Sequence, residues 1–503
     1  MNSAVVAAAL AAGALSGLRW LRVAQREHYL PGAAVRFAGR WWTTGVNRYL
    51  GAGGVVSLGA TLVRPVFGLG VAAAAAAGPV GLSLRGRTSK LAWTRRLRTL
   101  AGVWAALTAG VIAAGVVAGI GPFVAALAAV LTPLLVDVAL VLVAPVERRL
   151  GTEWVEQAAK RLREVGPRVV GITGSYGKTT TKGYVAHLVA ATRPVVATPA
   201  SFNNRSGLAR AVNEHLTPGT EVFVAEMGTY GPGEIAELCR WFPPDIAVIC
   251  AIGPVHLERM GSEEAIVAAK SEILVPAEVA VLNVDHPGLA RLADERAAAG
   301  RRVVRCSSRS VAGADVAVVG GRLTVGGRSL AEVPGGIIHA GNLACAVAVA
   351  LELGVPEAAV AGRLGGLPTP ASRLTVSTGT SGALVLDDTY NANPAGTTVA
   401  LAALVHHARD GHRRVVVTPG LVELGARQGA ENTRFAAAAV AAGVTDLVVV
   451  GHTNRRALLA GTAGGGVQVV VVDTRERAVA WVRQHVGAGD VVLYENDLPD
   501  HFP

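Results

Sequence analysis

The amino-acid sequence predicts an α/β protein preceded by an α-helical transmembrane region. Long stretches before residue 150 carry almost no charge, and after it short Val/Ile-rich runs alternate with helical stretches. A third observation is a glycine-rich loop that lies between one such run and the next helix, which indicates a P-loop. The predicted order is therefore a membrane region, a P-loop domain and a second, Rossmann-like α/β domain.

The first 150 residues are apolar and basic. Residues 3–18, 51–84 and 101–145 are the apolar stretches, and the last has room for two segments of about twenty residues, the length that crosses a bilayer core. Residues 1–150 hold 15 of the 47 Lys and Arg residues but only 3 of the 36 Asp and Glu residues, which leaves 32 basic and 33 acidic residues elsewhere. We therefore predict a membrane-anchoring helical region over 1–150 of a multi-pass cell-membrane protein, and no nucleic-acid partner. The alternative is a large buried helical core.

Basic stretches at 19–48 and 85–98 indicate the side of the membrane, because Lys and Arg favour cytoplasmic loops. If 101–145 is a hairpin, everything after residue 150 lies in the cytoplasm. For 19–48 to lie there too, 51–84 must form a second hairpin or dip in and return. Asp137 lies within an apolar segment, where it is either a functional residue or a helix-pairing hydrogen-bond partner.

From residue 151 the chain has the βαβ alternation of a parallel sheet covered by helices. We predict one α/β domain over 151–367 and a second over 368–503. The expected strands lie at 168–172, 195–198, 222–225, 246–252 and 279–283 in the first domain, and at 415–418, 447–450, 469–472 and 491–494 in the second, which begins its series near Leu384.

The glycine-rich loop reads GITGSYGKTTTK at 171–182. Such a loop presents backbone N–H groups and a helix N-terminus to a polyphosphate, while a lysine reaches the terminal phosphates and a hydroxyl ligates Mg²⁺. Ile172 stands where the Walker pattern has its first glycine. We predict nucleotide and Mg²⁺ binding by Gly174, Ser175, Gly177, Lys178, Thr179 and Thr180.

Three further residues follow strands of the first domain, where ligands of parallel sheets bind. Glu226 ends one strand, His256 follows the next, and Lys270 lies one helix further on. A carboxylate, an imidazole and the Thr179 hydroxyl near a triphosphate would form an Mg²⁺ site. Taken singly, each residue could equally be a helix cap or a surface residue.

Several segments together resemble the Mur ligase family over about residues 165–495. LDDTYNANPAG at 386–396 is similar to the branch that adds D-alanyl-D-alanine to a muramoyl tripeptide. The segments that resemble the central domain of the family are GITGSYGKTT, SFNNRSGL, AEMGTYGPGEI, PDIAVICAIGPVHLERMGSEEAI and AAKSEI.

The resemblance implies ATP-dependent amide formation, in which a substrate carboxylate is phosphorylated and an amine then attacks the acyl phosphate. It implies that Lys178 and Thr179 hold phosphates and Mg²⁺, and that Glu226, His256 and a carbamylated Lys270 bind metal. It further implies that Asn342 contacts adenine, that Arg373 reaches the γ-phosphate, that Asp387 or Asp388 holds the ribose, and that Asn203, Asn204, Asn391 and Asn393 position substrate.

Two departures from the family concern the substrates. The relatives have a soluble UDP-sugar-binding domain where this chain has its apolar region, and the Lys-Gly-Ser-Arg motif is replaced by the residues at 494–500. We expect a membrane-anchored ligase that joins an amino acid or dipeptide to a small-molecule or lipid-linked precursor in peptidoglycan biosynthesis. The alternatives are a ligase for a polyglutamate-like capsule or another peptide polymer, and a non-catalytic nucleotide-binding scaffold. The complete set of phosphate and metal residues argues against the scaffold.

Overall fold

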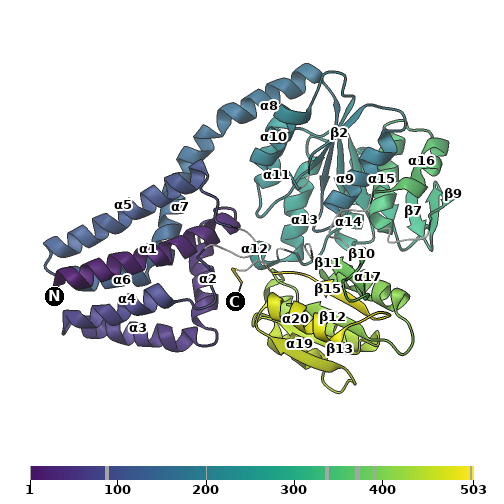
Figure 1. Cartoon of the computed structure of the whole chain (residues 1–503). Coiled ribbons are helices and arrows are strands. Elements are labelled where there is room, and N and C mark those ends of the chain that lie inside the picture. The colour runs from purple at the N-terminus through teal and green to yellow at the C-terminus, as the bar shows by residue number, and fades with distance from the viewer. Residues whose placement is uncertain are drawn as a thin grey trace. The chain divides into compact units, whose positions relative to one another are not determined.

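The protein divides into two compact units in the computed structural model (Figure 1). The helical unit comprises Met1–Leu150, Gly451–Thr453 and Asp497–Pro503, and the α/β unit comprises Gly151–Val450 and Asn454–Asn496. The residues that the structure describes are 2–84, 90–199, 201–255, 257–334, 339–368, 374–389, 392–498 and 501–502.

Within its described residues, the helical unit consists mainly of seven α-helices. They are α1 (Asn2–Arg26), α2 (Ala33–Trp42), α3 (Asn47–Thr61), α4 (Gly68–Ala77), α5 (Arg95–Val117), α6 (Gly121–Val130) and α7 (Thr132–Leu150). Among the described residues, α1 and α5 are long and apolar enough to cross a membrane, and α6 with α7, bent by 76° at their break, would make a third span if taken together. Close packing needs small residues here, since a Cβ on Gly17 of α1 would lie 2.2 Å from the Trp104 ring of α5.

The apolar stretch 51–84 lies mainly in two short helices. α3 has 15 residues and α4 has 10, with a 3₁₀ turn (Pro65–Phe67) between them that begins after Arg64. Neither helix reaches the roughly 20 residues that cross a bilayer.

Asp137 of α7 caps the beginning of α2. Its carboxylate oxygens accept the backbone N–H groups of Ala34 at 3.2 Å and of Val35 at 2.9 Å. A helix start leaves such N–H groups without intrahelical partners, and a buried one is costly. These contacts give Asp137 the helix-pairing role, one of its two predicted alternatives.

The α/β unit contains two sheets. The first has the order β2-β3-β1-β4-β5-β6-β7-β8-β9, parallel from β2 to β7 and antiparallel beyond. The second has the order β10-β11-β15-β12-β13-β14, with only β10 antiparallel. The sequence predicted β1 to β5 and β11 to β15 to within a few residues, because each is a Val/Ile-rich run, but it did not predict β6 and β7 as strands of the parallel region.

The strands of the first sheet are β1 (Arg168–Thr173), β2 (Val195–Ala197), β3 (Val222–Glu226), β4 (Ile246–Ile249), β5 (Val279–Asn283), β6 (Arg302–Ser307), β7 (Val316–Val319), β8 (Arg322–Val325) and β9 (Arg328–Glu332). Its helices are α8 (Thr152–Val165), α9 (Lys178–Val189), α10 (Arg205–His215), α11 (Glu234–Trp241), α12 (Leu257–Met260), α13 (Glu263–Ser271), α14 (Pro287–Ala298), α15 (Ala340–Glu352) and α16 (Glu357–Arg363). The second sheet comprises β10 (Thr375–Thr378), β11 (Leu384–Asp388), β12 (Arg414–Thr418), β13 (Asp446–Val450), β14 (Gln468–Val472) and β15 (Val491–Glu495), with α17 (Pro394–His407), α18 (Gln428–Ala441), α19 (Arg455–Gly461) and α20 (Arg475–His485).

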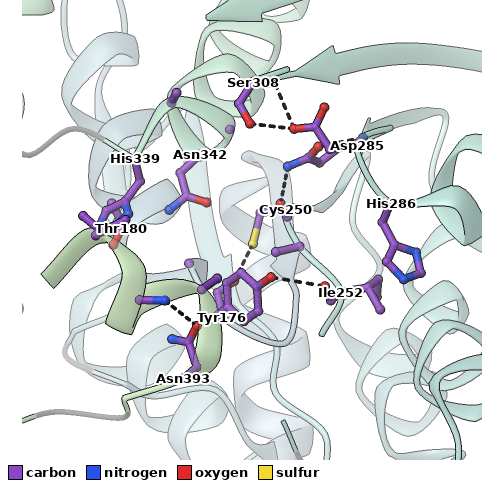
Figure 2. A pocket seen from close by; sticks show the side chains of 18 of the residues that line it. Tyr176, Thr180, Cys250, Ile252, Asp285, His286, Ser308, His339, Asn342 and Asn393 are labelled. Carbon is purple, nitrogen blue, oxygen red and sulfur yellow. Dashed lines mark hydrogen bonds between the residues drawn. The ribbon is translucent and has the colours of Figure 1, made fainter. Parts of the chain in front are cut away.

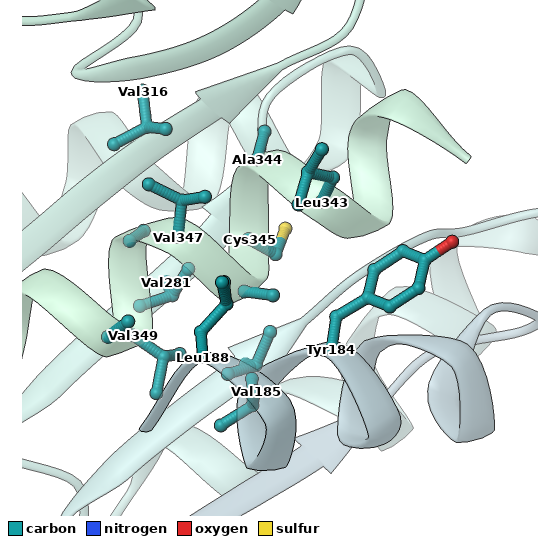
Figure 3. Close-up of a cluster of buried hydrophobic side chains, with 14 of the residues drawn as sticks. Tyr184, Val185, Leu188, Val281, Val316, Leu343, Ala344, Cys345, Val347 and Val349 are labelled. Atoms are coloured by element: carbon teal, nitrogen blue, oxygen red, sulfur yellow. The ribbon is translucent and has the colours of Figure 1, made fainter. Parts of the chain in front are cut away.

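Helices cover both faces of the first sheet. On one face α9 and α15 pack together, with Val185 and Leu188 against Leu343 and Val347 (Figure 3). α15 is apolar all round, and every residue from Asn342 to Ala350 is buried, as expected for a core helix. On the other face α8, α10, α11, α13 and α14 form a second core. This packing fixes the N-termini of α9 and α15 at the same edge of the sheet.

A carboxyl group is buried at the end of β15. The Glu495 side chain is fully buried, and neither carboxyl oxygen has a hydrogen-bond partner among the described residues. Burial, followed by the negative charge of Asp388, raises the pKa of Glu495 well above its usual range. The folded chain therefore favours the protonated form.

We expect Glu495→Gln to stabilise the α/β unit at neutral pH by about 1–3 kcal/mol, because the amide does not ionise. The folded pKa lies above the unfolded value of about 4.3, so the native chain loses stability as pH rises from that value toward the raised pKa. Urea unfolding of both proteins at about pH 5 and pH 8 measures this difference. Parallel pH dependence in the two proteins would contradict the assignment.

Candidate active site

The predicted glycine-rich loop joins β1 to α9, and its shape depends on glycine. Gly177 has a φ of +81°, a left-handed conformation, and a Cβ there would lie 2.4 Å from Oδ1 of Asn342. A Cβ on Gly174 would lie 2.6 Å from the Cys250 sulfur. Ser175 fastens the loop to the segment after β4, since its hydroxyl contacts the Gly253 carbonyl oxygen and amide nitrogen at 3.1 Å each. The loop therefore presents the N-terminus of α9 in a fixed position.

Lys178 begins α9 and folds back over the loop. Its ammonium donates a hydrogen bond to the Gly174 carbonyl at 2.8 Å. A lysine in this position can exchange that carbonyl for a phosphate oxygen without moving far. The next residue but one, Thr180, has a buried hydroxyl without a hydrogen-bond partner among the described residues.

Glu226, at the end of β3, joins three other polar side chains. Its Oε2 accepts the Thr179 hydroxyl at 2.9 Å, and its Oε1 accepts the Asn203 amide at 3.0 Å. Lys182 lies 3.6 Å from Oε2 and donates to the Thr198 carbonyl at 2.7 Å. Both members of this ion pair are almost fully buried. The structure thus brings together the predicted residues Thr179, Asn203 and Glu226.

The sequence analysis did not select Lys182, although it stands at the end of the quoted motif. Burial lowers the pKa of Lys182, while Glu226 acts in the opposite direction. The sequence feature that could have identified Lys182 is its position four residues after Lys178, because this spacing puts the two side chains on the same face of a helix.

Lys270, on α13, is buried close to the loop. Burial, and then the positive charge of Lys178, lowers the pKa of Lys270 to about 7. Near neutral pH a large share of this side chain is therefore a neutral amine. A neutral amine is a nucleophile, whereas an ammonium is not.

A cavity of about 530 Å³ opens beside the loop (Figure 2). Its lining includes Tyr176, Gly177 and Thr180 from the loop region, and Asn342 from α15. This volume is within the range of small-ligand pockets. The remaining polar residues that line it are Asn283, Asp285, His286, Ser308, Arg309, His339 and Asn393.

The wall around Asp285 is held by hydrogen bonds. Asp285 accepts the Ser307 hydroxyl at 2.5 Å, and the hydroxyl and N–H of Ser308 at 2.6 and 2.9 Å. The Asn283 amide donates to the Cys250 carbonyl at 3.0 Å. The sequence did not identify these residues, whose signal was their position at or just after the ends of β5 and β6.

The predicted residues of the second domain have local partners. Asp387 accepts the Thr389 hydroxyl at 2.6 Å, and Asp388 accepts the Leu374 N–H at 3.1 Å. Asn393 lines the cavity and caps α17 through the Gly396 N–H at 3.0 Å. Asn204 likewise caps α10 and is exposed. His256, Arg373 and Asn391 lie outside the described residues, so their predicted roles stay predictions.

A parallel sheet with a glycine-rich loop, a lysine at the helix start and an adjoining cavity defines a nucleotide-binding α/β protein. Comparison with known proteins identifies the family of nucleotide-binding proteins to which the chain belongs. Residues 172–340 match the Mur ligase middle domain, and residues 372–494 match the Mur ligase glutamate ligase domain. The chain belongs to the Mur ligase family, and it is an ATP-dependent, ADP-forming ligase.

Similar proteins include two mycobacterial enzymes named UDP-N-acetylmuramoyl-tripeptide--D-alanyl-D-alanine ligase. The one from Mycobacterium leprae is 35% identical over 371 residues, covering 65% of this chain and 70% of the relative. The one from Mycobacterium tuberculosis is 36% identical over 365 residues, covering 67% and 71%. A solved structure, MurF ligase from Thermotoga maritima in complex with ADP, is 26% identical with a TM-score of 0.56, covering 69% of this chain and 80% of that one.

We expect Gly177→Ala to weaken ATP binding by about tenfold or more. The added methyl group would occupy the position of the Asn342 amide, and L-residues disfavour the left-handed backbone conformation. Titration calorimetry with ATP or ADP measures the change. Gly219→Ala is a matched control, because Gly219 is also left-handed (φ +86°) but has nothing within 4 Å of its Cβ position. Equal loss in both variants would contradict a specific role for Gly177.

Proposed function

We propose that this chain is a MurF-type ligase that joins D-alanyl-D-alanine to a UDP-muramoyl tripeptide in peptidoglycan synthesis. The observation that carries the proposal is the cluster of Lys178, Lys182, Lys270 and Glu226 at the glycine-rich loop, in which Lys182, Lys270 and Glu226 are buried. The names and identities of the mycobacterial relatives support the choice of substrates.

The phosphate end of ATP is proposed to lie over the loop, with its base toward Asn342 and the cavity. Lys178 and the N-terminus of α9 would balance phosphate charge. The oxygens of Thr179 and Glu226 suit Mg²⁺, which prefers oxygen ligands and keeps positions for waters and phosphate oxygens. Bound Mg²⁺ supplies charge neutralisation of the phosphates. The proposal also includes the predicted roles of four further residues. His256 would bind metal, Arg373 would reach the γ-phosphate, and Asp387 or Asp388 would hold the ribose.

The proposed reaction has two steps. A carboxylate oxygen of the tripeptide attacks the γ-phosphorus of ATP, and the bond to ADP breaks with its electron pair staying on ADP. The amine nitrogen of the dipeptide then attacks the acyl carbon, phosphate leaves with the C–O electron pair, and the amine releases a proton. Lys178 contributes by stabilising the charge on the transferred phosphoryl group.

Lys270 is proposed to act as a carbamate. Its neutral amine nitrogen would bond to the carbon of CO₂ and release one proton, which converts a buried neutral amine into a buried carboxylate-like anion. The lowered pKa of Lys270 favours this reaction, and an ammonium would repel both Mg²⁺ and Lys178.

The helical unit is proposed to anchor the ligase to the cytoplasmic face of the cell membrane as a multi-pass region. Its support is the length and apolar composition of α1, α5 and the bent pair α6–α7. An anchored ligase would meet a lipid-linked acceptor as readily as a soluble one. A ligase for another peptide polymer is therefore the second candidate, and the substrate panel below separates the two.

We expect detergent-purified protein to release ADP when supplied with ATP, UDP-muramoyl tripeptide and D-Ala-D-Ala, and to form a product of the summed mass less one water. Lys178→Ala should lower this rate by about 100-fold or more while leaving the membrane-bound fraction unchanged. Turnover only with a lipid-linked or polymeric acceptor, or with another amine, would contradict the proposed substrates. Full activity of Lys178→Ala would contradict the phosphate site.

We expect Lys270→Ala to lower kcat by about 100-fold, with partial recovery when formate or acetate is added. Because the neutral amine reacts with CO₂, carbamylation by limiting CO₂ should increase as pH rises through about 7. Steady-state rates measured with and without added bicarbonate test this. Lys160→Ala, an exposed lysine on α8, is the control and should change nothing. A fully active Lys270→Ala protein would rule the carbamate out.

A further inference from the structure

The chain leaves the α/β unit after β15 and becomes part of the helical unit again. The boundary falls between Asn496 and Asp497. Asn496 fixes this exit point, because its amide donates to the Gly420 carbonyl at 2.6 Å and its N–H donates to the Asp388 carbonyl at 3.1 Å. Asn496 also has a φ of +66°, which turns the chain out of the strand direction.

His501 is buried in the helical unit. Its Nε2 lies 3.0 Å from Oε1 of Glu27, and its backbone carbonyl accepts the indole N–H of Trp41 at 2.8 Å. The side chains of His501 and Glu27 are 2% and 7% exposed. Glu27 also accepts a hydrogen bond from Arg36 at 3.1 Å. Buried polar contacts of this kind are costly to break, because each leaves its partner unsatisfied.

Phe502 adds an apolar contact next to this polar one. Its ring packs edge-on against Phe37 of α2 at 4.9 Å, and the His501 ring lies 4.8 Å from the same phenyl group. The Arg40 guanidinium stacks over both phenyl rings, at 4.9 Å from Phe37 and 5.5 Å from Phe502. Aromatic and cation–π contacts of this geometry are typical of specific docking sites.

We propose that the end of the chain carrying His501 and Phe502 is a docking segment that binds the helical unit. It follows directly on the residues at 494–500, which replace the Lys-Gly-Ser-Arg motif. His501 and Phe502 contact Glu27, the residue after α1, and Phe37, Arg40 and Trp41 of α2. The chain that forms the α/β unit is thereby joined to the helical unit at both of its ends, covalently at residues 150–151 and through the docking segment.

The experiment separates the two attachments. A protease site inserted between Leu150 and Gly151 cuts the first one, and an affinity tag on the helical unit then captures whatever stays bound. We expect most of the 151–503 fragment to be retained after cleavage. His501→Ala combined with Phe502→Ala should lower the retained fraction about tenfold, and an excess of the peptide DLPDHF should release the fragment from the unchanged protein.

His485→Ala is the matched control, since His485 also stacks on an aromatic ring, Trp481, but belongs to α20. ADP binding by each released fragment checks that the α/β unit is folded. Equal retention of the native and doubly substituted fragments, or immediate release of the native fragment, would overturn the proposal. None of these readouts depends on ligase turnover, so the proposal stands or falls separately from the substrate assignment.

Discussion

The charge balance behind the glycine loop is the constraint on which the α/β unit depends. Lys178 and Lys182 follow each other by one helical turn on α9, and a single carboxylate, Glu226, lies against the second of them. Lys270 lies close enough to Lys178 for that positive charge to lower its pKa. Lys182 and Lys270 are buried, and a buried charge is costly unless it has a partner. Lys182 pairs with Glu226, and loss of the proton from Lys270 removes a second buried charge. A bound polyphosphate would offset the charge of Lys178.

The fold brings Thr179, Glu226 and Lys270 together although they are far apart in the sequence. Thr179 lies at the start of α9, Glu226 at the end of β3 and Lys270 on α13, the second helix after β4. β1 pairs with both β3 and β4, so the carboxyl ends of these strands form one edge. The buried helix α15 completes this edge by bringing Asn342 against Gly177. Packing between α9 and α15 therefore sets the distance between the glycine-rich loop and Asn342. A residue with a side chain would not fit at Gly177, where the loop and α15 approach closely.

The sequence predicted most of the parallel strands, because short Val/Ile-rich runs that alternate with helical stretches are typical of buried strands in a parallel sheet. It also predicted that the glycine-rich loop lies between a strand and a helix and that Glu226 ends a strand. It did not predict that Lys182 would be a buried partner of Glu226, because a lysine on a short helix is usually exposed. The capping roles of Asn204 and Asn393 are local and had a signal in the residues that follow them. The contact of Glu27 with His501 spans 474 positions, and no local pattern reports a pairing of that range.

Contacts within the helical unit gather the ends of its long helices at one end of the unit. Gln25, near the end of α1, hydrogen-bonds Ala92 just before α5, and Arg95 at the start of α5 contacts Glu147 near the end of α7. The docking segment binds beside the same end of α1, at Glu27. The basic residues of α1 and α5 lie at this end too. The chain therefore leaves the helical unit after α7 and rejoins it through His501 at the same end.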